Sequence, residues 1–129
     1  QTCALPILPD NCPLSRAIPC NLKVYMLCNS EVITKQDCLT QAERGRAANV
    51  SGELLCTRHG LSVFSSLKSC IHQQKLFPHL GNHIAYADLH EEHGVIAETP
   101  AKLNPRHMTW WAYEEVERDN CFVVMQLEQ

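Results

Sequence analysis

The chain has 129 residues, of which 45% are hydrophobic and 19% charged, and its formal net charge is -3. This length is typical of one domain and is sufficient to bury a core without help from metals or disulfides. The longest apolar runs are far shorter than the roughly 20 residues that a membrane helix needs. The mildly negative charge argues against general nucleic-acid binding, which needs a basic surface. Composition therefore predicts a soluble globular domain with neither a membrane nor a general nucleic-acid partner.

The N-terminal part of the sequence differs from the remainder. Residues 1–22 contain four prolines, whose spacing excludes a regular helix and favours an extended arm. Residues 23–129 are expected to form a single packed domain. The change near residue 22 is the candidate boundary, since the sequence has no internal repeat and no low-complexity segment.

The first half of the domain is predicted to contain a strand and a helix. Residues 23–28 end in an apolar run and are predicted to form a strand. A helix is predicted from Lys35 to about Ala47, because Thr34 is a favourable N-cap and Asp37 follows it as in a capping box. Residues 53–58 are consistent with either a short helix or a strand.

The second half is predicted to be richer in strands. A second helix is expected at about residues 67–77, capped by Ser65 or Ser66 and ended by Pro78. The connection His90–Gly94 ends in glycine and predicts a hairpin loop. The order of elements indicates an α+β fold, with two helices packed on a mostly antiparallel or mixed sheet of about five or six strands. Strands are predicted here at residues 61–64, 83–89, 95–98, 108–113 and 121–127.

The eight cysteines are compatible with up to four disulfides. Five of them occupy positions where any small hydrophobic residue would serve, and free cysteine behaves as one. The other three lie in the proline-rich arm, where their role stays open. This distribution favours a reduced, cytoplasmic protein, with a secreted and oxidised one as the alternative. The five are Cys28, Cys38, Cys56, Cys70 and Cys121, and the three are Cys3, Cys12 and Cys20.

A group of histidines and carboxylates indicates a candidate zinc site. His90 and His93 are close enough in sequence to share one ion, and Asp88 or His83 could add a third ligand. Zinc binds imidazole and carboxylate groups with tetrahedral geometry. The alternative is a solvated polar turn, because exposed polar residues gather in such connections. Zinc is the one cofactor that the sequence suggests.

An aromatic segment near the C-terminus is the main candidate for ligand binding. Trp110 and Trp111 point to opposite faces if the segment is a strand, so one is expected in the core and the other at a surface or cleft. An exposed indole near Arg106, with Tyr113 beyond it, could stack on a base, a nicotinamide or a peptide side chain. The alternative is that the tryptophan pair only stabilises the sheet.

An enzymatic alternative rests on four weak catalytic candidates. Arg58 and His59 belong to a segment that resembles the Arg-His-Gly signature of histidine phosphatases, although the remaining chain is too short for that fold. His107 and Glu114 flank the aromatic segment and could reach the same cleft. The sequence contains no glycine-rich phosphate loop and no nucleophile elbow.

From about Val24 to Val124 the order of short motifs resembles a group of small bacterial proteins without an established activity. This resemblance implies a bacterial cytoplasmic protein and transfers no catalytic residue. The motifs are VYML at 24–27, DCLT at 37–40, HGLSVF at 59–64, FPHLG at 77–81, HIA at 83–85, EHG at 92–94 and HMTWWAY at 107–113.

The order of strand, short helix and antiparallel strands is also similar to ADP-ribosyltransferase scaffolds. Those use a polar residue on an early strand, an aromatic residue for nicotinamide and a late glutamate, and Tyr25 departs from this pattern. The leading hypothesis is a small binding protein whose protein or small-molecule partner binds through the aromatic strand. The alternatives are an ADP-ribosyltransferase-like or other nucleotide-using enzyme and a secreted, disulfide-stabilised binding module.

Overall fold

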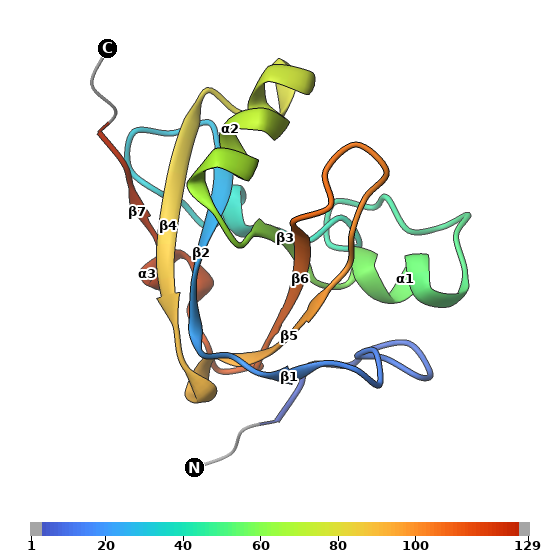
Figure 1. The fold of residues 1–129 in the computed structure, drawn as a ribbon. Helices are drawn as coiled ribbons and strands as arrows, with labels where there is room; N and C mark the ends of the chain where they lie inside the picture. The colour runs from blue at the N-terminus through green and yellow to red at the C-terminus, as the bar shows by residue number, and fades with distance from the viewer. Residues whose placement is uncertain (1–3, 127–129) are drawn as a thin grey trace.

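A computed structural model describes residues 4–126 of the chain as one antiparallel sheet with helices packed beside it (Figure 1). The fold is α+β, as predicted, but the described residues form seven strands rather than five or six. None of their helices is long and apolar enough to cross a membrane. The α-helices are α1 (Gly52–Arg58), α2 (Leu67–Leu76) and α3 (Arg118–Cys121), and the 3-10 helices are η1 (Gln36–Cys38), η2 (Pro78–Leu80) and η3 (Glu91–His93). The strands are β1 (Ile18–Pro19), β2 (Leu22–Cys28), β3 (Leu61–Phe64), β4 (His83–Leu89), β5 (Gly94–Glu98), β6 (His107–Ala112) and β7 (Val123–Val124).

The strands lie in the order β1-β5-β6-β3-β2-β4-β7, and every neighbouring pair is antiparallel. The sheet is strongly curled, with β2 and β4 in one wall and β5 and β6 in the other (Figure 1). Alternation along the strands sends apolar side chains to both faces. One face carries the main core, which includes Val24, Val63 and Trp110. On the other face, residues of α2 pack against Phe64 and Ile84.

The connection between β4 and β5 is not the hairpin loop that the sequence predicts. β4 pairs with β2 and β7, whereas β5 pairs with β1 and β6. The helix η3 therefore carries the chain from one wall of the curled sheet to the other. Gly94 follows it with a φ of 135°, in the region that favours glycine. A short connection is possible without a hairpin because the curl brings the two walls close together at this end (Figure 1).

The predicted helix from Lys35 to Ala47 is wrong, because only η1 forms there. The chain leaves helical geometry at Leu39, whose ψ is 139°. Immediately afterwards the Thr40 backbone N–H donates to Glu43 Oε1 at 2.8 Å, and the Glu43 N–H donates to Thr40 Oγ1 at 3.1 Å. These reciprocal capping bonds between Thr40 and Glu43 start a new turn, and they compete with continuation of the helical turn that begins after Thr34.

Most of the other predicted elements form close to their expected positions. Helix α2 is confirmed, and Ser66 caps it by accepting a hydrogen bond from the Ser69 N–H at 3.1 Å. The ambiguous residues 53–58 are helical and belong to α1. The last strand is much shorter than predicted, since Cys121 belongs to α3 and β7 contains only two residues.

The N-terminal segment is attached to the domain by a disulfide and by sheet pairing. Cys12 forms a disulfide with Cys56, and β1 pairs with β5. Leu14 is buried in a cluster with Cys56, and Cys20 is fully buried in the main core. Cys56 is therefore not the simple core residue that its position suggests, and Cys20 is one. The position of Cys3 lies outside the described residues.

Candidate functional site

The pairing between β2 and β3 is limited to a single residue pair. These strands pair only at Tyr25 and Phe64, whereas β2 pairs with β4 along all seven of its residues. If the β2–β3 ladder continued, it would place Leu27 opposite Ser62. Instead the strands diverge, and a cavity of about 330 Å³ opens that both residues line. Its size falls within the range of small-molecule sites.

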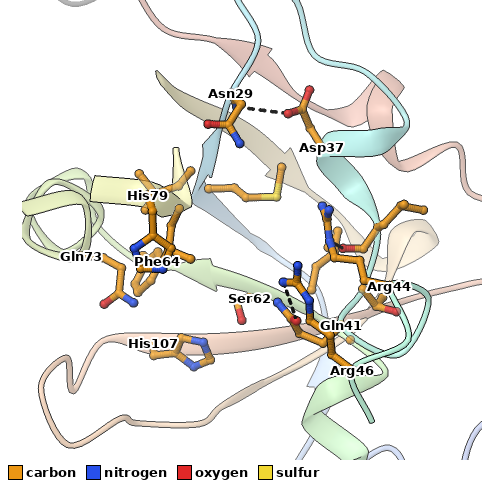
Figure 2. Close-up of a pocket in the computed structure, with 17 residues that line it drawn as sticks. Asn29, Asp37, Gln41, Arg44, Arg46, Ser62, Phe64, Gln73, His79 and His107 are labelled. Atoms are coloured by element: carbon orange, nitrogen blue, oxygen red, sulfur yellow. Dashed lines mark hydrogen bonds between the residues drawn. The ribbon is translucent and has the colours of Figure 1, made fainter. Parts of the chain in front are cut away.

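Polar side chains approach this cavity from two sides (Figure 2). Gln41, Arg44 and Arg46 come from the segment between η1 and α1. His79 of η2 and His107 of β6 lie on the opposite side, together with Gln73 of α2. Ser62 of β3 lies between the two groups. The arginines therefore reach the sheet from the segment that was predicted to be helical but forms only η1.

The two arginines are held to different extents. Arg44 donates from Nη2 to the Gln36 carbonyl oxygen at 2.7 Å and from Nε to the Leu39 carbonyl oxygen at 3.3 Å. These bonds fix its position. The Arg46 guanidinium donates only to Gln41 Oε1, at 3.4 Å, among the residues that the structure describes. Most of the Arg46 guanidinium donors are therefore available to a ligand.

Asp37 is the only carboxylate among the described residues that line the cavity, and its oxygens are already engaged. One oxygen accepts from the Asn29 backbone N–H at 3.1 Å, and the other accepts from the N–H and hydroxyl of Thr34 at 3.0 and 2.9 Å. Burial alone would raise the pKa of Asp37, but these hydrogen bonds outweigh it and hold the pKa below its usual value. The predicted Thr34–Asp37 capping contact is confirmed, and it turns the carboxylate towards its own loop.

His107 is held by Thr99, which stands eight residues earlier in the chain. Its Nδ1 lies 2.9 Å from the Thr99 carbonyl oxygen and 2.9 Å from the Thr99 hydroxyl. The imidazole also packs edge-on against Phe64, with ring centroids 5.5 Å apart. Burial lowers the pKa of His107, while the Thr99 carbonyl partly opposes this shift. The ring is consequently neutral near pH 7.

Some predicted site residues meet in a second, smaller cavity of about 260 Å³. His59, Trp110, Tyr113 and Glu114 border it, and the N-terminal segment forms part of its wall. His107 lines the first cavity instead. The Arg58 side chain is directed to the Arg46 carbonyl oxygen, to which Nη1 donates at 2.6 Å. The four catalytic candidates therefore do not share one site.

The two tryptophans are both core residues. Each is 1% exposed, so neither lies at the surface, although Trp110 borders the second cavity. Trp110 donates its indole N–H to the His93 carbonyl oxygen at 3.2 Å, and Trp111 donates to the Cys56 carbonyl oxygen at 3.0 Å. Both faces of β6 are covered, one by the main core and the other by α1 and the N-terminal segment. Arg106 is exposed and lines neither cavity.

The candidate zinc ligands do not form a metal-binding site within the described residues. Within residues 4–126, no three histidine, cysteine, aspartate or glutamate side chains lie together so that they could hold an ion. His93 uses Nδ1 to accept the His90 backbone N–H at 2.9 Å. Asp88 lies 3.9 Å from the Lys23 ammonium group. The His93 ring therefore bonds within the η3 connection, and Asp88 faces Lys23 of the paired strand β2.

An ion pair between Glu43 and Arg118 borders the second cavity. Arg118 donates from Nη1 to Oε1 and from Nη2 to Oε2, both at 2.8 Å. The hydrogen bond from Arg118 lowers the pKa of Glu43 from 4.5 to about 2. A carboxylate whose pKa falls on folding stabilises the folded state above its unfolded pKa. That contribution is lost as the pH falls from about 4.5 to about 2.

We therefore expect a Glu43→Gln variant to be less stable than the wild type at pH 6, by about 1 kcal/mol, since the pair is partly exposed and screened by solvent. The difference should shrink between pH 4.5 and pH 2 as wild-type Glu43 becomes protonated. Urea unfolding of both proteins across this range measures it. Glu91→Gln, an exposed carboxylate outside any described ion pair, is the control. A difference that is constant with pH would contradict the assignment.

In comparisons with protein-family models, with curated proteins and with solved structures, the chain matches none of them. Arg44 and Arg46 were missed by the sequence reasoning, although the Arg-Gly-Arg triplet at 44–46 is a visible signal. Its glycine has a φ of 78°, which a continuous helix would not accept.

Proposed function

We propose that the protein is a small binding protein that holds a small anion in the cavity between β2 and β3. The observation that carries the proposal is the available Arg46 guanidinium at a cavity of ligand size. Guanidinium groups bind carboxylates and phosphates through paired, charge-assisted hydrogen bonds. A binding function agrees with the hypothesis from sequence, but the proposed site lies at the diverging strands instead of the aromatic strand.

The charge balance of the cavity supports an anionic ligand. Arg44 and Arg46 bring two guanidinium groups, and Asp37 brings one carboxylate. Since Asp37 is directed at Asn29 and Thr34, it does not neutralise Arg46 through a direct bond in the described structure. A carboxylate or phosphate group would supply the missing partner. Ser62 and Gln73 offer additional neutral hydrogen-bonding groups at the wall.

The test titrates the protein with inorganic phosphate and with succinate. Binding is measured from the NMR chemical shifts of the backbone amides. We expect shifts at cavity residues such as Ser62 and Arg44. An Arg46→Gln variant should bind about tenfold more weakly or worse, because it loses a charge-assisted contact. Arg106→Gln removes an equal charge from an exposed position outside the cavity and is the matched control.

Two outcomes would contradict the proposal. In the first, neither phosphate nor succinate shifts the cavity signals. In the second, Arg106→Gln weakens binding as much as Arg46→Gln does, which would indicate attraction by net charge rather than a defined site.

A further inference from the structure

The imidazole of His107 has a fixed orientation at the cavity wall. β6 places it opposite Phe64 of β3, and the two rings pack at an interplanar angle of 79°. Thr99 holds its Nδ1 side through both its carbonyl and its hydroxyl oxygen. The Thr99 hydroxyl is itself fixed by a 2.8 Å hydrogen bond to Thr109 Oγ1. Phe64 of β3, Thr99 immediately after β5 and Thr109 of β6 thus position one ring.

This contact determines which nitrogen carries the proton. A carbonyl oxygen only accepts hydrogen bonds, so the 2.9 Å contact with the Thr99 carbonyl places the proton on Nδ1. In a neutral ring, Nε2 is then an acceptor with a free lone pair. Burial lowers the pKa of His107, which keeps the ring in this neutral form near pH 7.

The Nε2 atom has no hydrogen-bond partner within residues 4–126. It is also absent from the buried, unsatisfied polar atoms of that range, so it is not completely buried. The open space that His107 lines is the cavity that Arg46 also lines, from the opposite side (Figure 2). Two amide oxygens at the cavity are already engaged, because Gln41 Oε1 accepts from Arg46 and Gln73 Oε1 accepts from Asn104.

We infer that the ligand is a hydroxylated small anion, whose carboxylate or phosphate group binds Arg46 and whose hydroxyl donates a hydrogen bond to His107 Nε2. This inference rests on the proposed anion-binding function and deepens it. A cavity with cationic donors on one side and a neutral acceptor on the other selects a ligand that carries both complementary groups. An anion without the hydroxyl leaves Nε2 without a partner.

The test compares ligands that differ only in their hydroxyl groups, of which malate has one and glycerol phosphate two. Malate and succinate share two carboxylates, and glycerol phosphate and propyl phosphate share a phosphate ester. In calorimetric titrations we expect the hydroxylated member to bind about tenfold more tightly in at least one pair, and the pair that responds identifies the anionic group. Equal affinities within both pairs would overturn the inference.

A His107→Asn variant tests the role of the ring. Its side-chain amide can still donate to the Thr99 carbonyl oxygen, as Nδ1 does, but it has no group in the position of Nε2. The preference for the hydroxylated ligand should disappear while the non-hydroxylated ligand still binds. A preference that persists would assign the hydroxyl to another group.

A measurement on the wild type covers the case in which the variant does not fold. The ¹⁵N signal of His107 Nε2 should move on addition of the preferred hydroxylated ligand and much less with its partner. If none of the four ligands binds, or if they bind with an affinity that Arg46→Gln does not change, the anion site itself is wrong. If both members of a pair bind equally and depend on Arg46, only the assignment of His107 is wrong.

Discussion

A Gly94→Ala variant is expected to lose about 4 kcal/mol of folding stability or to fail to fold. Two costs add at this position. The φ of 135° is a strained conformation for any residue with a Cβ, which costs about 1–3 kcal/mol. A Cβ would also overlap the Trp111 carbonyl oxygen and lie 2.9 Å from the Ala112 Cα, and such overpacking costs a further 1–3 kcal/mol or so. The contacted atoms are backbone atoms of β6, which cannot move away without breaking the sheet.

Gly45→Ala provides the matched control for this substitution. Gly45 also has a positive φ, of 78°, but a Cβ added there would meet no atom within 4 Å. Its loss should therefore be limited to about 1 kcal/mol of backbone strain. Urea unfolding followed by the fluorescence of the two buried tryptophans measures both variants. Equal losses at the two glycines would show that the close approach of β5 and β6 is not a constraint.

Removal of the Cys12–Cys56 disulfide is expected to have the second large effect. The bridge closes a loop between residues 44 positions apart, and loop-closure entropy predicts a loss of about 4 kcal/mol without it. A Cys12→Ser, Cys56→Ser double variant should show this loss in denaturant unfolding. Peptide mapping under non-reducing conditions should recover the two cysteines as one cross-linked peptide.

A dithiol reductant supplies the control for the disulfide prediction. It should lower the stability of the wild type towards that of the double variant, and it should leave the double variant unchanged. A wild type that is insensitive to the reductant and as stable as the double variant would show that the bridge does not stabilise the protein. The same comparison tests whether the disulfide holds the N-terminal segment, whose Ala4 carbonyl accepts the Glu114 N–H at 2.8 Å.

The local elements were predictable where the sequence contains a clear period or cap. The alternation in residues 83–89 gave β4, and the Ser66 cap with Pro78 gave the bounds of α2. The helix after Thr34 failed because Thr40 and Glu43 form a competing set of capping bonds one turn later. Strand β1 was missed because its two residues, one of them proline, are ordered by pairing with β5 rather than by their own pattern.

The candidate site was predictable only in part, because its residues meet through long-range contacts. His107 was selected from its neighbours in sequence, yet its orientation depends on Thr99 across a β-ladder. Arg44 and Arg46 reach the cavity from a segment that leaves helical geometry at Leu39, so their position could not be read from a regular helix. Trp110 and Trp111 were overvalued because the sequence did not show that both faces of β6 are covered.

The strand order also has a consequence for how this chain acquires its structure. Among the described strands, only β5 and β6 pair as close neighbours in sequence. β2 can pair with β4, and β1 with β5, only after the later strand has been synthesised. Pairing between distant segments is slow, because the entropic cost of closing the loop comes before the stabilising contacts form. During vectorial synthesis the N-terminal strands would leave the ribosome before any of their partners. The two edge strands, β1 and β7, come from opposite ends of the described residues, so the sheet is completed only after β7 has been synthesised.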